Sequence, residues 1–152
     1  TWHYGAKHTT GDAAKPLPHD LRCEFESLPW PKDIVLDAEW MGPRCAAHVK
    51  EHSLHVFDIL HYRNDGWLGN TPFSKRYEIL QAIWALHIHS SPHIHLVPVR
   101  PNPGLVDFFA TQLTDPTSEG LVVRKATSGL IGSFTRCAVN PEVFKIKYKE
   151  VR

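Results

Sequence analysis

The sequence is poor in cysteine, in long apolar runs and in net charge, and each shortage removes a class of protein. Its three cysteines, Cys23, Cys45 and Cys137, form no C-x-x-C pair, so a zinc site built from four cysteines is excluded. An odd number of widely spaced cysteines also argues against a disulfide framework and favours a reducing compartment. No run approaches the roughly 18 apolar residues of a membrane span, so we expect no membrane partner.

The charge and composition are those of an ordinary globular domain. A formal net charge of +1 provides no general attraction for nucleic acid, so any such binding has to come from local patterning. The composition, with 42% hydrophobic and 22% charged residues over 152 positions, is typical of one domain without internal repeats. Because the first residue is Thr1 rather than Met, we expect a fragment or a processed chain.

Apolar residues recur with the periods of both helices and strands. Helical spacing predicts helices over 19–28, 74–88 and 104–113. β-branched and aromatic residues between turn signals predict strands, which cover 33–41, 53–60, 94–99, 119–125 and 142–151. The Asp-Gly pair at 65–66 marks a long turn over 61–72. Strands outnumber helices and come in adjacent groups, so we expect an α+β fold with mainly antiparallel sheets.

Eleven histidines are unusual for this length, and four of them stand in the stretch LHIHSSPHIHLV. A His-x-His pair on a strand points both imidazoles to one face, where they can chelate one metal ion. No carboxylate or thiolate stands nearby at ligand spacing, so we instead expect His87 and His89 to end the long helix. His93 and His95 then enter the next strand after a Ser-Ser-Pro turn. A histidine-based metalloprotein is the alternative.

Cations follow the strand pattern near the end of the chain. Alternation over 142–151 places Lys145, Lys147 and Lys149 on one face, a row suited to phosphates lying along a strand. The alternative is an edge strand protected from aggregation by its lysines. The stretch EGLVVRK has a similar character, because it opens with Glu119 and ends in two cations. Its glycine permits close approach of a ligand or of another backbone.

Carboxylates stand two residues apart in LDAEW, where Asp37 and Glu39 share one face of the expected strand. Such a pair offers oxygen ligands to a hard cation. Taken alone, this pattern and the cationic strands are each typical of a solvated surface as well.

Taken in chain order, these segments resemble a known series. LDAEW, then HVFDIL with the P-x-x-x-R of TPFSKR, then EGLVVRK, then VFKIKYK are similar to the motifs of covalent nucleotidyltransferases, specifically ATP-dependent DNA ligases. That family shows a D-G-E strand, an F-D strand with P-x-x-x-R and an apolar helix after it, an E-G strand and a closing K-x-K strand. The resemblance spans residues 30–149 approximately.

The resemblance implies a ligase adenylation domain with an ATP-grasp-like fold. Such a domain acts in DNA repair and replication inside the cell, in the cytoplasm or associated with the nucleoid. There it seals nicked duplex DNA through enzyme-AMP and DNA-adenylate intermediates. Its cofactors are ATP and magnesium. By this resemblance Phe57 would stack on the adenine ring, and Glu39 would contact the adenosine ribose or a metal ion. Glu119 would help to hold the magnesium ion, which neutralises the charge that develops during phosphoryl transfer.

The cationic positions bind the phosphates in this resemblance. Lys145 and Lys147 would bind the α-phosphate and the leaving pyrophosphate, and with Glu119 they are the implied catalytic residues. The family usually places a lysine five residues after the glutamate, where this sequence has Arg124 followed by Lys125. Arginine also binds phosphate, so we expect both residues in the nucleotide site.

Two further departures concern Ala38, which replaces the glycine of D-G-E, and the nucleophile. The family's nucleophile is the lysine of K-x-D-G, and no lysine of this sequence stands in that motif. We therefore expect 1–152 to be part of an adenylation domain, without the nucleophile segment and without the C-terminal oligonucleotide-binding domain. Such a piece would be inactive alone and would work with other parts of the same ligase.

A second class of function is open at this point. A non-catalytic nucleotide- or nucleic-acid-binding remnant would keep the aromatic and basic groups without the covalent chemistry. RNA is also open as the substrate because the shared motifs serve both nucleic acids, although the FDIL and P-x-x-x-R pattern favours DNA.

Overall fold

The computed structural model describes residues 17–43, 50–88, 91–115, 118–133, 136–137 and 140–147. Its helices are α1 (His19–Ser27), α2 (Phe73–Ile83) and α3 (Leu105–Thr114), with a 3-10 turn at Arg63–Asp65 and a π-helical turn at Trp84–Ile88. Its strands are β1 (Ile34–Met41), β2 (Ser53–Tyr62), β3 (Gly66–Trp67), β4 (Ile94–Leu96), β5 (Gly120–Arg124), β6 (Gly132–Ser133), β7 (Arg136–Cys137) and β8 (Val143–Lys147).

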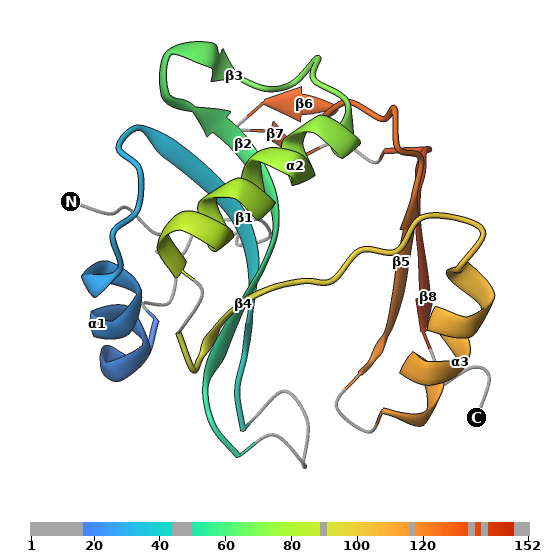
Figure 1. The fold of residues 1–152 in the computed structure, drawn as a ribbon, viewed down its shortest axis with the longest axis horizontal. Helices are drawn as coiled ribbons and strands as arrows, with labels where there is room; N and C mark the ends of the chain where they lie inside the picture. The colour runs from blue at the N-terminus through green and yellow to red at the C-terminus, as the bar shows by residue number, and fades with distance from the viewer. Residues whose placement is uncertain are drawn as a thin grey trace.

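The strands form one larger sheet of four strands and two smaller sheets of two strands each. In the larger sheet β2 lies between β1 and β3, both antiparallel to it, and β4 pairs with β2 in parallel. The two small pairs, β5–β8 and β6–β7, are antiparallel. Helix α2 lies across one face of the larger sheet, while β5 and β8 stand to its side with α3 in front of them (Figure 1). The expected α+β class with mainly antiparallel sheets is confirmed.

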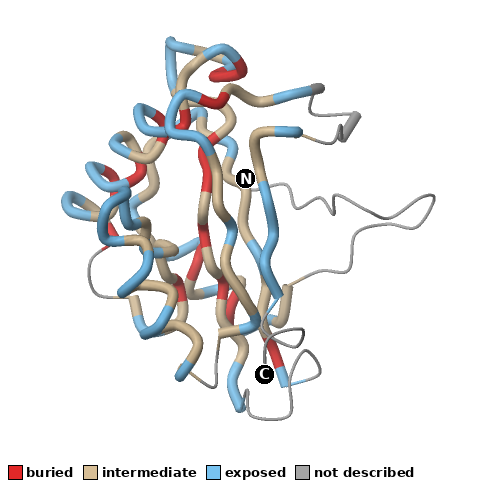
Figure 2. Tube along the Cα trace, turned by 90° about the vertical axis from the view of Figure 1, so that its right-hand side faces the viewer, coloured by how far each residue is buried: buried red, intermediate tan, exposed pale blue. Residues whose placement is uncertain are grey.

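The core lies between the larger sheet and the helices. Val56 and Ile59 of β2 are fully buried against Leu80 and Ile83 of α2, which lie three residues apart on one helix face. Figure 2 shows these buried segments where the layers meet, with exposed turns on the outer side of the helices. Burying each such side chain stabilises the fold by about 1.5–3 kcal/mol.

Helix α1 closes one end of the same sheet. Its Leu21 and Phe25 pack with Leu54 of β2 and Ile94 of β4. The helix ends at Ser27, and Leu28 after it has extended backbone (φ −74°, ψ 146°), because the residue before a proline disfavours the α region.

Several expected boundaries change in the structure. The stretch 61–72 is not one turn: β2 continues through Tyr62, and Gly66–Trp67 returns as β3. The reversal between them uses Gly66 at φ +69°, a conformation that glycine adopts at little cost. Of the strand expected over 94–99, only Ile94–Leu96 forms a strand. Residues 148–151 of the last expected strand lie outside the described residues.

The second expected helix is confirmed, with a change of winding. Pro72 precedes it with φ −54°, and α-helical bonds run to Ile83 before the π-helical turn that follows. None of the helices that the structure describes is long and apolar enough to cross a membrane.

Candidate functional site

A buried carboxylate joins three distant segments of the chain. Asp58, in the middle of β2, is 2% exposed and accepts two hydrogen bonds from Arg76 of α2, Nε to Oδ1 and Nη2 to Oδ2, both at 2.8 Å. Arg124 at the end of β5 donates from Nη1 to Oδ2 at 2.7 Å. The backbone N–H of Ile59 donates to Oδ1 at 2.9 Å. We call Asp58, Arg76 and Arg124 the Asp58 cluster.

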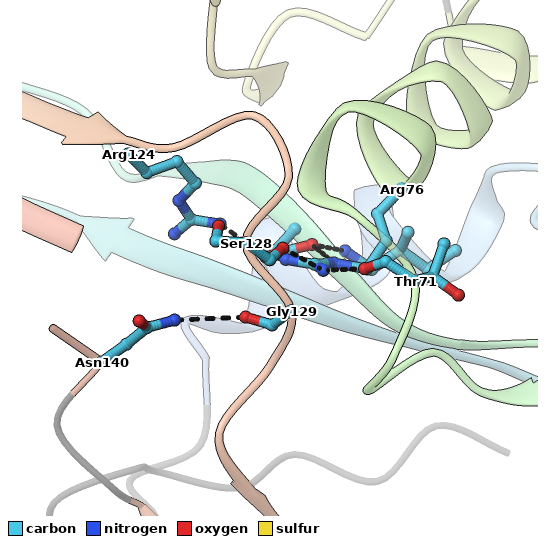
Figure 3. Close-up of polar contacts among 8 residues, drawn as sticks. Thr71, Arg76, Arg124, Ser128, Gly129 and Asn140 are labelled. Carbon is cyan, nitrogen blue, oxygen red and sulfur yellow. Dashed lines mark hydrogen bonds and ion pairs between the residues drawn. The ribbon is translucent and has the colours of Figure 1, made fainter. Parts of the chain in front are cut away.

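Arg76 also ties the loop after β5 to the start of α2. Its Nη1 donates to the carbonyl oxygens of Thr71 and Ser128 (Figure 3). The same loop accepts a bond from the N–H of Phe73 onto the Ser128 carbonyl at 2.9 Å. A guanidinium offers five donors in a fixed fork, so one fully buried arginine can hold a carboxylate and two carbonyls together.

Arg124 is the more exposed member of the Asp58 cluster. Its side chain is 18% exposed, and its Cζ lies 4.3 Å from the ring centroid of Phe73, a cation–π distance. It borders an open hollow of about 350 Å³ lined also by Val123, Lys125, Pro141, Glu142 and Phe144. Because two guanidiniums meet one carboxylate, the Asp58 cluster carries an excess of one positive charge.

The register of β5 and β8 collects cations on one face. Lys145 pairs with Val122, and Lys147 pairs with Gly120, so both lysines share the face from which Arg124 projects. Both lysines are exposed. We call Arg124, Lys145 and Lys147 the cationic face.

The glycine of the E-G pattern has a packing role. A Cβ on Gly120 would overlap the carbonyl oxygen of Ile146 on β8, so only glycine allows the two strands to approach this closely. Of the two possibilities that the sequence raised, close approach of a ligand or of another backbone, the structure shows the second. The residue thus sets the position of Lys147 relative to β5.

The remaining expected residues near this two-stranded sheet flank β5. Glu119 is exposed immediately before β5. Lys125 follows β5 and forms an ion pair with Glu142, which precedes β8, Nζ to Oε1 at 3.0 Å, with 64% of the lysine side chain exposed. This exposed ion pair leaves Lys125 near the hollow beside Arg124.

Glu39 and Phe57 belong to the larger sheet. Glu39 is exposed on β1 and pairs with His55, while the next pair, Ala38 with Val56, faces the core. Phe57 is an extra residue in β2, because Ala38 pairs with Val56 and Asp37 with Asp58, which is a β-bulge. The half-buried Phe57 belongs to neither of the core clusters formed by the described residues, although Val56 before it is fully buried.

The structure therefore brings the expected residues into two groups, which a hydrogen bond connects. One group lies on or immediately beside the two-stranded sheet β5–β8: Glu119, Arg124, Lys125, Lys145 and Lys147. The other, Glu39 and Phe57, lies on the larger sheet. The bond from Arg124 to Asp58, the residue after Phe57, joins the two groups. Of the expected metal ligands, Glu39 lies on β1 of the larger sheet, and Glu119 immediately precedes β5 of another sheet.

Magnesium suits these two carboxylates in chemistry. The ion is usually held by one or two carboxylates, with substrate phosphates and waters completing its coordination. Glu39 and Glu119 are both exposed, and neither forms an ion pair with a residue that the structure describes. No group of three or more His, Cys, Asp or Glu within the described ranges is placed to hold a metal by itself.

The histidine stretch is a helix-to-strand joint, as expected. His87 lies in the π-helical turn, His95 lies in β4, and His89 lies outside the described residues. His93, just before β4, bonds through Nδ1 to Glu24 of α1 at 2.7 Å and through Nε2 to Glu51 at 3.2 Å.

These contacts change the acidity of the groups involved. Hydrogen bonds to Glu24 and Glu51 raise the pKa of His93, outweighing its slight burial. Burial alone would raise the pKa of Glu24, but hydrogen bonds from Ser91 and His93 lower it overall. In the paired strands β2 and β4, burial lowers the pKa of His55, and the neighbouring His95 lowers it further, with ring centroids 5.1 Å apart.

The Asp58 cluster was not recognised in the sequence as a structural unit. The signal was present, since Asp58 interrupts the apolar run VFDIL and a buried carboxylate requires a cationic partner. Arg76 likewise stands on the apolar face of α2, between Phe73 and Leu80.

The chain matches no protein-family model and no curated protein, so these residues and their arrangement are the basis for a functional proposal.

Proposed function

We propose that this chain is part of the adenylation domain of an ATP-dependent DNA ligase, working inside the cell with ATP, magnesium and nicked duplex DNA. One observation carries the proposal: the Asp58 cluster joins the FDIL strand, the P-x-x-x-R helix and the EGLVVRK strand in direct contact. The strand with K-x-K then pairs with the EGLVVRK strand. Motifs that are remote in sequence but meet at one place are what a shared ligand site requires.

In this proposal each group has its own part of the nucleotide. Phe57 stacks on adenine and Glu39 contacts the ribose or the metal, while the cationic face neutralises the phosphates. Glu119 helps to hold magnesium, which would supply further charge neutralisation on the phosphate oxygens. The lysines act as ammonium ions and are therefore not nucleophiles. Residues 1–152 alone should accordingly bind nucleotide reversibly, without forming a covalent adduct.

The binding experiment separates the base from the phosphates. Calorimetric titration with ATP and magnesium should show weak, reversible binding, to which the base and the phosphates each contribute. Phe57→Ala should weaken the binding of ATP and of adenosine by roughly tenfold, the value of one lost base stack, and leave the binding of tripolyphosphate unaffected. The double variant Lys145→Ala, Lys147→Ala should weaken the binding of ATP and of tripolyphosphate and leave the binding of adenosine unaffected. Lys75→Ala, in the exposed pair with Glu78, is the matched control.

The result decides the proposal directly. Binding of ATP that does not respond to Phe57→Ala or to the double lysine variant contradicts it, as does the absence of any ATP binding. The ionic pairing of Arg124 with Asp58 and of Lys125 with Glu142 favours one alternative, a non-catalytic nucleotide- or nucleic-acid-binding protein. A covalent lysine-AMP adduct, formed once residues carrying K-x-D-G are joined to the chain, distinguishes the ligase from that alternative.

A further inference from the structure

We propose that Asp58 is a positioning residue for phosphate binding. It holds the Arg124 guanidinium against Phe73, so that the unused edge of the guanidinium becomes the third cation of the cationic face. The nature of the anion, the polyphosphate of a nucleotide, rests on the proposed function. The anion site itself rests on geometry and charge.

The orientation of Arg124 is fixed at two points. Its Nη1 is bonded to Asp58 Oδ2 at 2.7 Å, and its Cζ lies 4.3 Å from the ring centroid of Phe73. Asp58 itself has little freedom, because Arg76 grips both of its oxygens from a fully buried position. A guanidinium has five N–H donors, so the single bond to Asp58 leaves donors on Nε and Nη2. These belong to a side chain that is 18% exposed.

The charge of the Asp58 cluster favours an anion at this edge. One carboxylate neutralises only one of the two guanidiniums, and the excess positive charge lies where Asp58 is 2% and Arg76 0% exposed. Charges interact more strongly in such a poorly solvated place than at an open surface. Arg76 is committed to Asp58, Thr71 and Ser128, so Arg124 is the member that presents the excess charge to a ligand.

The strand register places this edge beside the two lysines. Along the face, Lys145 lies one two-residue step from the level of Arg124, about 7 Å, and Lys147 lies a second step beyond, about 14 Å. Lysine and arginine side chains are long enough to converge on one extended polyphosphate across that span. The face thus contains one cation held by two contacts, followed by two exposed lysines.

The geometry also explains why an arginine stands here. A lysine is a point charge without a planar fork, so it cannot bond Asp58, stack on Phe73 and still present a directed edge to phosphate. The proposal therefore predicts that Arg124→Lys, which keeps the charge, loses phosphate affinity. A role confined to neutralising Asp58 predicts no such loss.

The test measures inorganic tripolyphosphate and adenosine separately, by calorimetry on the full chain. Arg124→Lys leaves the Asp58–Arg76 pair in place and should weaken the binding of tripolyphosphate by at least about tenfold, the value of a lost charged hydrogen bond. Asp58→Asn should cause a similar loss, and little further loss when it is combined with Arg124→Lys. Adenosine affinity should stay within about twofold in all three variants. Where Asp58→Asn does not fold, Asp58→Glu keeps the charge, displaces the guanidinium and should show the same loss.

Three results overturn the inference. One is unchanged tripolyphosphate affinity in Arg124→Lys. Another is a loss in the Asp58 variant that persists undiminished in the Arg124→Lys background, and the third is a parallel loss of adenosine binding. Failure of the nucleotide proposal looks different: tripolyphosphate binding that depends on Arg124, together with no adenosine binding by the unmodified chain.

Discussion

Replacing Asp58 with asparagine should destabilise the fold more than any change at an exposed ion pair. Asp58 accepts four hydrogen bonds, of which three come from guanidinium groups, and it is 2% exposed. The substitution removes the only negative charge of the Asp58 cluster and leaves two cations facing each other beneath the surface. Removing one partner of a buried ion pair costs about 3–5 kcal/mol, a large share of the roughly 5–15 kcal/mol that holds a domain folded.

Two further variants make this prediction quantitative. Arg124→Gln removes one charged bond and keeps the Asp58–Arg76 pair, so about 1–2 kcal/mol is expected after allowing for its partial exposure. Lys75→Gln breaks a pair whose side chains are 64% and 58% exposed, and should cost less than about 1 kcal/mol. Urea denaturation monitored by tryptophan fluorescence gives the three free energies of unfolding, provided that the slopes agree. A cost for Asp58→Asn no greater than that of Lys75→Gln would refute the reasoning.

Three other predictions follow from the same contacts. His93→Gln should cost less than about 1 kcal/mol, and more at pH 6 than at about pH 9. Because the pKa of His93 is raised and the pKa of Glu24 is lowered, both groups are charged between their ordinary pKa values of 4.5 and 6.5, and the ion pair is complete there. Its contribution to stability is lost as pH rises through the raised pKa of His93. A difference in the free energy of unfolding between wild type and variant that does not change with pH would contradict this. Gly120→Ala should cost about 1–3 kcal/mol in thermal unfolding, because the new methyl group meets the Ile146 carbonyl, and an unchanged midpoint would show that β8 gives way easily. Replacing the four histidines of LHIHSSPHIHLV with Gln should leave metal content by atomic emission unchanged, whereas loss of stoichiometric zinc would favour a metalloprotein.

Local patterns in the sequence were sufficient to predict most elements of the fold. Leu80 and Ile83 repeat at helical spacing, and the apolar run around Val56 lies between turn signals, so α2 and β2 were found near their observed ends. The two-residue strands β3, β6 and β7 could not be found, because a strand that short has no alternation to detect. The β-bulge at Phe57 is equally invisible, since it depends on the pairing partner.

The candidate site shows where reading by motif ends. The sequence assigned Arg124 to phosphate by position, but its bond to Asp58 depends on a partner 66 residues away. Asp58 needed a cation, and the chain offers 17 lysines and arginines, so only the fold could select Arg76 and Arg124. The two readings of Arg124 are compatible if its free edge meets the phosphate.

Covalent labelling with ATP gives the sharpest test of the assignment to a ligase adenylation domain. Residues 1–152 are incubated with labelled ATP and magnesium, denatured and counted, beside a longer chain in which a segment carrying K-x-D-G is joined ahead of Thr1. No label is expected on residues 1–152 alone. Stoichiometric, acid-labile label is expected on a lysine of the longer chain, and Glu119→Ala or Lys145→Ala should abolish it. Label on residues 1–152 alone, or none on a longer chain that contains K-x-D-G and binds ATP, would contradict the assignment to the ligase adenylation domain.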